Sequence, residues 1–217
     1  MSDPVQPSLL DRLRPVISDA RLSTYLTAAG FDEDRALALY LWNVQIGEAF
    51  HLPIQAVEVA LRNRIHAAMS QRFGRTWWQD AGLAAELDME RTADLAQVLR
   101  RIRNRKLSLD SGQVVAGLSF GFWVGMLQKR YNPPLWAGRL HHAFPDYPVD
   151  RNRATMARTA GRVAWLRNRI WHHEPLIGHD LSAEYGNVMT LLGWLSAPKA
   201  QWIRANSRVP GLLRQKP

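Results

Sequence analysis

The segment from Arg151 to Pro175 constrains the fold of this chain more than any other. With Asp150 as the expected N-cap, its apolar residues recur at the spacing of one helical face: Met156, Ala160, Val163, Ala164, Leu166 and Ile170. Pro175 disfavours the helical conformation of Glu174, so the helix is expected to end at about His173. The sequence therefore predicts a long helix with two histidines in its last turn.

Helical spacing recurs along the rest of the chain, and strand-like alternation does not. We expect further helices over residues 19–29, 32–50, 53–72, 88–105, 114–130 and 183–195. Pro53 is interpreted as the first turn of its own helix, and Gly74 as the end of that helix. Residues 1–17 are expected to be irregular, and the tail from Lys199 peripheral. The sequence predicts an all-α protein, a single all-helical domain over residues 1–217.

The net charge of +9 comes largely from arginine and points to a polyanionic partner. Guanidinium groups bind phosphate at two points, which favours nucleic acid, although a GC-rich genome also raises arginine usage without functional cause. One basic run ends the helix expected at 88–105 and contains Arg100, Arg101, Arg103, Arg105 and Lys106. It is interpreted either as a solvated helix end or as a contact to an RNA backbone.

Several classes of protein are disfavoured by composition. The chain has no cysteine, which excludes disulfides and thiolate metal sites and fits a reducing compartment. No apolar run is long enough to span a membrane, and the first residues do not resemble a signal peptide. Nucleotide-binding glycine motifs are absent. We expect a cytoplasmic protein without a cofactor and without a membrane segment.

The end of the central helix carries a family resemblance. Residues Arg167 to His172 read Arg-Asn-Arg-Ile-Trp-His, which fits the RxxxxH signature of the HEPN superfamily. The longer string Leu166 to Pro175 looks like that of bacterial Abi-like (abortive-infection-like) proteins. A looser similarity covers Asn43 to Gly74. The resemblance implies a HEPN-like helical bundle over roughly residues 32–195 with additional flanking helices, and a homodimer in which the motif helices face each other.

That resemblance also implies an activity, a metal-independent endoribonuclease in phage defence or acting as a toxin, with RNA as substrate and a possible antitoxin or defence-system partner. His172 would take the proton from a ribose 2′-hydroxyl, and Arg167 would hold the adjacent phosphate. Asn168, one turn before His172, would orient the imidazole or bind the ribose. Additional RNA contacts are expected from Arg162, Arg169 and His173.

Each of these residues has a structural alternative. His172 could be a surface or capping group, and Arg167 could pair with an acid such as Glu174. Asn168 could be an exposed polar residue, and Arg162, Arg169 and His173 could be solvated surface groups. At the level of the whole protein, the alternative is a non-catalytic helical module that binds RNA or a protein through the same basic surface.

Three glycines at four-residue intervals, Gly117, Gly121 and Gly125, would line one face of the helix expected at 114–130. Such a face lets another helix or another subunit approach closely. The nine tryptophans exceed what packing alone requires, and with the glycines they would suit a dimer interface.

Two further patterns have open interpretations. Residues 61–65 repeat the pentapeptide Leu-Arg-Asn-Arg-Ile of residues 166–170, with His66 directly after it. The repeat is either chance or a second set of phosphate contacts. Histidines also cluster as His141-His142 and as His172, His173 and His179, but adjacent histidines on a helix point in different directions, so a metal site is disfavoured.

Overall fold

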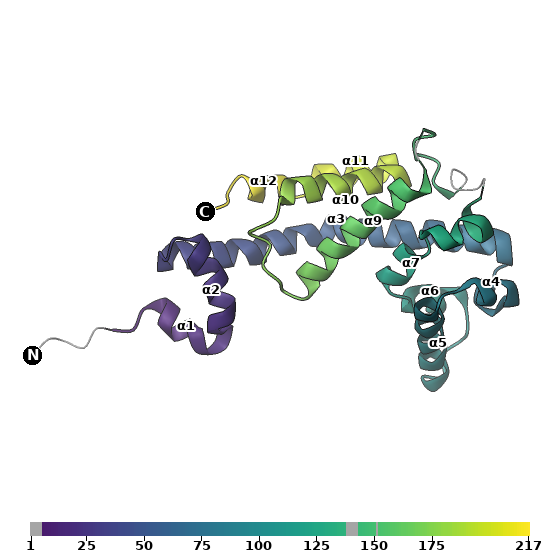
Figure 1. Ribbon diagram of the computed structural model, residues 1–217, viewed down its shortest axis with the longest axis horizontal. Helices are drawn as coiled ribbons and strands as arrows, with labels where there is room; N and C mark the ends of the chain where they lie inside the picture. The colour runs from purple at the N-terminus through teal and green to yellow at the C-terminus, as the bar shows by residue number, and fades with distance from the viewer. Residues whose placement is uncertain (1–5, 138–142, 151) are drawn as a thin grey trace, which may run out of the picture.

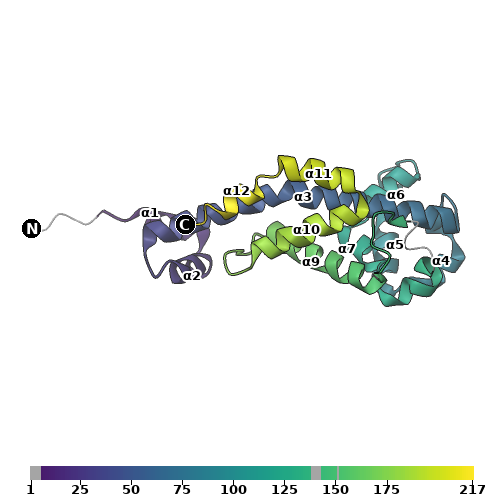
Figure 2. The ribbon, with the colours of Figure 1, turned by 90° about the horizontal axis from the view of Figure 1, so that it is seen from above.

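The computed structural model describes residues 6–137, 143–150 and 152–217. Within these ranges the chain forms helices and turns and contains no strand, which confirms the all-α prediction. The longest element is α3 (Glu33–Phe73), whose 41 residues extend about 60 Å. The other helices are arranged along its length (Figures 1 and 2).

Three groups of elements flank α3. The first is α1 (Leu9–Ile17) and α2 (Asp19–Ala28). The second comprises η1 (Trp77–Gln79), α4 (Ala81–Glu86), α5 (Met89–Asn104), α6 (Ser111–Gly117), α7 (Phe120–Gly125), η2 (Lys129–Tyr131) and η3 (Asn132–Trp136). The third comprises α9 (Arg153–Trp171), α10 (Leu181–Leu195), α11 (Ala197–Asn206) and α12 (Val209–Leu213).

Helix α3 runs without interruption through Pro53, so the prediction of two helices separated at this residue was wrong. The apolar face continues in phase on both sides of the proline, where Phe50, Ile54 and Val57 are fully buried. An internal proline costs about 3 kcal/mol through a lost hydrogen bond and a steric clash. Packing of the same face against α9 and α10 offsets that cost.

Helices α1 and α12 lie in segments where the sequence suggested irregular or peripheral structure. Ser8 forms a capping box with Asp11, in which Ser8 Oγ accepts from the Asp11 backbone N–H at 3.1 Å and starts α1. At the other end, Trp42 Nε1 donates to the Leu212 carbonyl at 2.8 Å, and Val209 is fully buried. The expectations of an irregular start and a peripheral tail were therefore wrong, because both segments bury apolar residues against the rest of the chain.

The glycine-spaced segment forms two helices rather than one. The helical path breaks at Leu118, and Ser119 caps α7 by accepting from the Phe122 backbone N–H at 3.1 Å. A Cβ atom at Gly117 would lie 2.7 Å from Val98, and one at Gly125 would lie 2.1 Å from the Arg91 guanidinium. The close approach predicted for the glycines therefore occurs within the chain, against α5.

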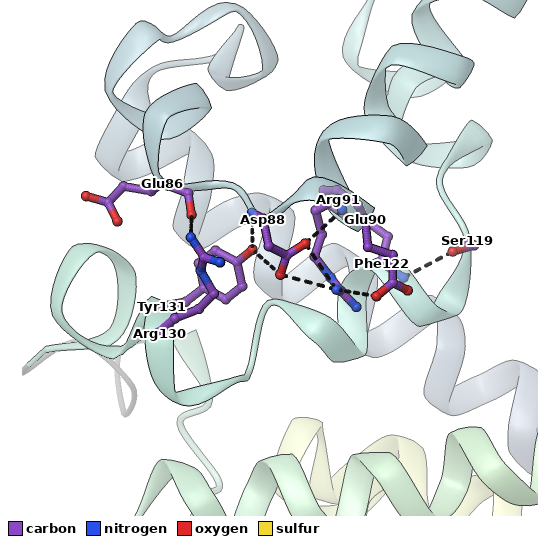
Figure 3. Close-up of polar contacts among 8 residues, drawn as sticks. All are labelled: Glu86, Asp88, Glu90, Arg91, Ser119, Phe122, Arg130 and Tyr131. Atoms are coloured by element: carbon purple, nitrogen blue, oxygen red, sulfur yellow. Dashed lines mark hydrogen bonds and ion pairs between the residues drawn. The ribbon is translucent and has the colours of Figure 1, made fainter.

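Arg91 is a buried cation that fits against Gly125. Its Nη1 pairs with Asp88 Oδ1 at 3.2 Å and Glu90 Oε2 at 2.8 Å, and the Tyr131 hydroxyl donates to Asp88 at 3.0 Å (Figure 3). Burial opposes the charged form of Asp88, but hydrogen bonds from Arg91 and Tyr131 outweigh it and lower the pKa of this carboxyl. The network joins α5 to η2.

Most tryptophans belong to the core. Six of the nine are buried: Trp42, Trp77, Trp78, Trp123, Trp136 and Trp194. Trp77 is the centre of an aromatic group, with Phe122 at 6.4 Å and Trp123 at 6.1 Å between ring centroids. The aromatic surplus therefore serves packing for the most part, and only Trp171 and Trp202 are exposed.

Candidate functional site at the end of helix α9

Helix α9 ends at Trp171, two residues earlier than expected, and begins after Asn152 rather than Asp150. His172 is the C-cap, and His173 adopts the left-handed conformation with φ 55°. The His173 backbone N–H donates to the Ile170 carbonyl and that of Glu174 to the Arg169 carbonyl, which is the Schellman pattern. The two histidines therefore lie at a sharp turn rather than on a regular helical face.

The strained His173 backbone is held from another element. Arg21 on α2 donates from Nη1 to the His173 carbonyl at 2.8 Å. Glycine is the usual residue at such a left-handed position, so the contact from α2 helps offset the cost for histidine. The α1–α2 segment thus positions the end of α9.

Arg167 is positioned by three neighbours. Its Nε donates to Glu58 Oε1 on α3 at 2.8 Å, and its guanidinium carbon lies 4.8 Å from the centre of the Trp171 ring. Nη1 also reaches the amide oxygen of Asn168 at 3.4 Å, a weak contact. The side chain extends along the helix towards the turn that carries His172. The acid that pairs with Arg167 is therefore Glu58, whereas Glu174 pairs with Arg169 at 2.9 Å.

His172 and Asn168 are both exposed. Within the described part of the chain, the His172 imidazole has no hydrogen-bond, ion-pair or ring partner. It is accessible to solvent and to a ligand. The structure thus brings the Arg167 guanidinium to the residue that precedes His172, without a direct contact between the two side chains.

The arginines expected to add phosphate contacts already have acidic partners. Arg162 pairs with Glu184, whose side chain is only 3% exposed, and stacks on Trp165 at 4.8 Å. Arg169 pairs with Glu174 and donates to the Pro175 carbonyl at 3.0 Å. RNA contact by either arginine stays a prediction, and such contact would compete with these ion pairs.

The histidines do not form a metal centre in the part of the chain that the structure describes, where no three acidic or histidine side chains converge. His179 packs edge-on against Trp165 at 5.0 Å. Burial, together with the nearby cations Arg169 and Arg162, lowers the pKa of His179. His141 and His142 lie outside the described residues.

A pocket of about 700 Å³ lies beside the turn. Its lining comes from α2, α3 and the end of α9: Arg21, Tyr25, Tyr40, Asn43, Val44, Gly47, Glu48, His51, Ile170, Trp171, His173, Glu174 and Leu176. The residues on either side of His172 both line it. Burial raises the pKa of Tyr25 to about 12, against the opposing effect of Arg21, so its hydroxyl is protonated at neutral pH.

The sequence patterns did not predict this pocket or the role of Glu58. One signal was available, because Asn43, Gly47 and His51 recur every four residues and interrupt an otherwise apolar helix face. Their importance depends on which elements pack opposite them, and the helical period does not reveal that. In the first copy of the pentapeptide and the histidine after it, Arg64 donates to the Leu195 carbonyl at 3.0 Å, and His66 accepts from Trp77 Nε1 at 3.0 Å.

The basic end of α5 is a separate cationic surface. Arg100, Arg101, Arg103, Arg105 and Lys106 are all exposed, and none of them forms an ion pair with another described residue. Figure 1 shows α5 projecting away from α3. Arg100, Arg103 and Lys106 also rim a second pocket of about 660 Å³, whose floor includes Leu99 and Ile102.

No helix in the described ranges is both long and apolar enough to cross a membrane. Comparison of the chain with protein-family models, with curated proteins and with solved structures finds no match.

Proposed function

We propose that the chain is a metal-independent endoribonuclease of the HEPN superfamily, similar to Abi-like proteins, which acts in the cytoplasm in phage defence or as a toxin. The observation that carries this proposal is the arrangement of Arg167. The ion pair with Glu58 and the stack on Trp171 hold its guanidinium beside the residue that precedes the exposed His172. Arg167 would supply the cation for the phosphate, and the His172 imidazole would accept the proton.

The reaction would proceed by transfer within the RNA. The His172 imidazole removes the proton from a ribose 2′-hydroxyl, and the resulting oxygen attacks the neighbouring phosphorus atom. The bond from phosphorus to the 5′-oxygen breaks, and that oxygen takes up a proton. The products are a 2′,3′-cyclic phosphate and a 5′-hydroxyl. An imidazole suits this step because it exchanges protons near neutral pH.

Arg167 would stabilise the charge that builds on the phosphate oxygens. Removal of one such group typically costs a factor of about 10² to 10³ in rate. Asn168 lies one helical turn before His172, where it can contact the ribose. DNA would be a poor substrate because it lacks the 2′-hydroxyl.

The test compares purified wild-type protein with Arg167→Ala and His172→Ala on a mixed RNA substrate in the presence of a chelator. Arg158→Ala is the matched control, since Arg158 is an exposed arginine on the same helix, outside the motif. We expect cleavage by the wild type and the control, and a loss of about 100-fold or more in both motif variants. Equal cleavage by all four proteins, or cleavage that requires metal, contradicts the proposal.

A homodimer with facing α9 helices belongs to the same proposal, as does regulation by an antitoxin or a defence-system partner. The two glycines that make close contacts, Gly117 and Gly125, face α5 of their own chain, so a dimer would have to use another surface. The exposed end of α9 is the surface that the proposal requires. Sedimentation analysis of the wild-type protein tests it directly.

The second candidate is a non-catalytic helical module that binds RNA or a protein. The unpaired cations at the end of α5 favour it, because they lie on a projecting helix and need no chemistry at α9 to bind a polyanion. Arg100→Ala combined with Arg103→Ala would then abolish binding of RNA, whereas variants at Arg167 or His172 would leave this binding unchanged. RNA binding without any cleavage by the wild type would favour this candidate.

A further inference from the structure

The pocket beside α9 adjoins the proposed catalytic turn. Trp171 and His173 line it, and His172 lies between them in the chain. Its volume of about 700 Å³ is within the usual range of about 300 to 1,000 Å³ for small-molecule sites. A ligand in the pocket would therefore be next to any group bound by Arg167 and His172.

The pocket contains a stacked pair of aromatic rings. The rings of His51 and Trp171 are 5.2 Å apart and inclined by only 20°. Both side chains are exposed, and the Arg167 guanidinium lies over the same indole. Stacked aromatic and cationic groups of this kind bind nucleobases irrespective of sequence.

Asn43 supplies a polar group deep in the pocket. It is 9% exposed, and its Oδ1 accepts from the Leu176 backbone N–H at 2.6 Å. Its Nδ2 has no partner among the described residues and is not sealed from solvent, so two donor hydrogens remain for a ligand. Gly47 beside it has no side chain, which leaves space above Ile170 and Leu176.

The charges around the pocket do not oppose a polyanion. Of the two lining carboxylates, Glu48 pairs with Arg208 at 2.6 Å and Glu174 pairs with Arg169 at 2.9 Å. Arg21 adds a further cation to the wall. An RNA strand can thus approach without meeting an unpaired negative charge in this lining.

We propose that this pocket binds one base of the RNA, next to the phosphate that is cleaved, by stacking on His51 and Trp171 and by donation from Asn43. The inference rests on the proposed function. The Asn43 amide nitrogen can donate to an acceptor on the base, either a carbonyl oxygen or a ring nitrogen.

The test measures binding of the four ribonucleoside 3′-monophosphates to the full chain by calorimetry, with ribose 5-phosphate as the probe without a base. His51→Ala removes one ring of the stack, and Leu52→Ala is the control, since Leu52 is a neighbouring exposed residue outside the pocket. We expect the nucleotides to bind at least about tenfold more tightly than ribose 5-phosphate. His51→Ala should weaken them about tenfold and Leu52→Ala should not.

A second variant tests base recognition. Asn43→Asp keeps the acceptor for the Leu176 N–H but loses the donors, and thermal unfolding reports whether it folds. Nucleotides should bind more weakly to this variant than to the wild type. The inference is overturned if nucleotides bind no more tightly than ribose 5-phosphate, if His51→Ala leaves their affinity unchanged, or if folded Asn43→Asp keeps the wild-type affinity.

These measurements separate the two proposals, because mononucleotide binding needs no cleavage. If nucleotides bind as described while Arg167→Ala and His172→Ala behave as wild type on RNA, the base pocket stands and the nuclease fails. If those two variants lose cleavage while His51→Ala changes neither nucleotide affinity nor cleavage preference, the nuclease stands and the base pocket fails.

Discussion

Arg167 on α9 and Glu58 on α3 form an ion pair, with 2.8 Å between Nε and Oε1, that joins two helices more than one hundred residues apart in the chain. Both side chains are about one quarter exposed. The contact uses Nε and leaves Nη2 of the guanidinium without a partner among the residues described. Glu58 can therefore hold the arginine in place while it binds a phosphate.

Glu58→Gln should lower cleavage without unfolding the protein. Loss of the ion pair frees the Arg167 side chain, and poor placement of a catalytic group costs about tenfold or more in kcat. A partly exposed pair contributes up to about 1 kcal/mol to stability, so the free energy of unfolding should change little. Steady-state kinetics with kcat and KM determined separately check this.

The control for Glu58→Gln is Glu33→Gln, which removes a glutamate of the same helix that lies outside the pocket and pairs with no other described residue. It should retain the wild-type kcat. A normal kcat in Glu58→Gln would show that the ion pair has no positioning role.

Gly125→Ala and Gly121→Ala should have opposite effects on stability. A Cβ atom at Gly125 would lie 2.1 Å from the buried Arg91 guanidinium, so the cation must move away from its acidic partners. We expect a loss of about 3 kcal/mol. Gly121 is exposed, with its nearest contact 3.6 Å away, so alanine there should be neutral or stabilise by up to about 1 kcal/mol. Urea unfolding of both variants provides the comparison, and equal effects would contradict the packing described.

Asp88 should make the protein sensitive to acid. Its pKa in the folded state is below the ordinary value of 3.8, so its stabilising contribution is complete above that value and is lost as the pH falls through the folded pKa. Asp88→Asn should lower the free energy of unfolding at pH 7 by about 3 kcal/mol and flatten its decline below pH 4.

Asp80→Asn provides the comparison for Asp88→Asn, because Asp80 caps α4 in the same manner, with the Leu83 N–H at 2.8 Å and no arginine contact. Unfolding curves measured between pH 7 and pH 2 would show the difference. Identical acid profiles for the wild type and Asp88→Asn would rule out this role.

His66 should reduce stability below neutral pH. Burial lowers its pKa from the ordinary 6.5, and its Nδ1 accepts from Trp77 Nε1 at 3.0 Å. The contribution of His66 to the free energy of unfolding is complete above pH 6.5. It declines as the pH falls, because the unfolded chain binds the proton more readily than the folded chain does. The hydrogen bond itself contributes about 1 kcal/mol.

In His66→Asn the amide oxygen can replace Nδ1 as acceptor, but nothing titrates at this position. Its unfolding free energy should therefore change less between pH 7 and pH 5 than that of the wild type. His179, whose pKa is also lowered, adds a change of the same sign in both proteins. If the unfolding free energy of His66→Asn changes with pH as much as that of the wild type, His66 is not the source of the pH dependence.

Local patterns predicted α5 and α10 within two residues of their observed bounds. Caps explain this accuracy: Asp88 caps the start of α5 and Asp180 caps the start of α10. Where the prediction failed, contacts between distant segments outweighed the local signal. Pro53 stays within α3 because the helix is packed on both sides of it. The tail is ordered because Trp42 donates to the Leu212 carbonyl and Glu48 forms an ion pair with Arg208.

The sequence by itself determined the helical class, the approximate bounds of α5 and α10, and the place of Arg167 and His172 at the end of one helix, because helical period, caps and prolines act over a few residues. Only the tertiary structure decided that Arg167 pairs with Glu58 and that the Arg91 guanidinium packs against Gly125. It also decided that Asn43 and His51 line a pocket with Trp171. Those relationships depend on how helices cross, and crossing is set by the burial of side chains from segments far apart in the chain.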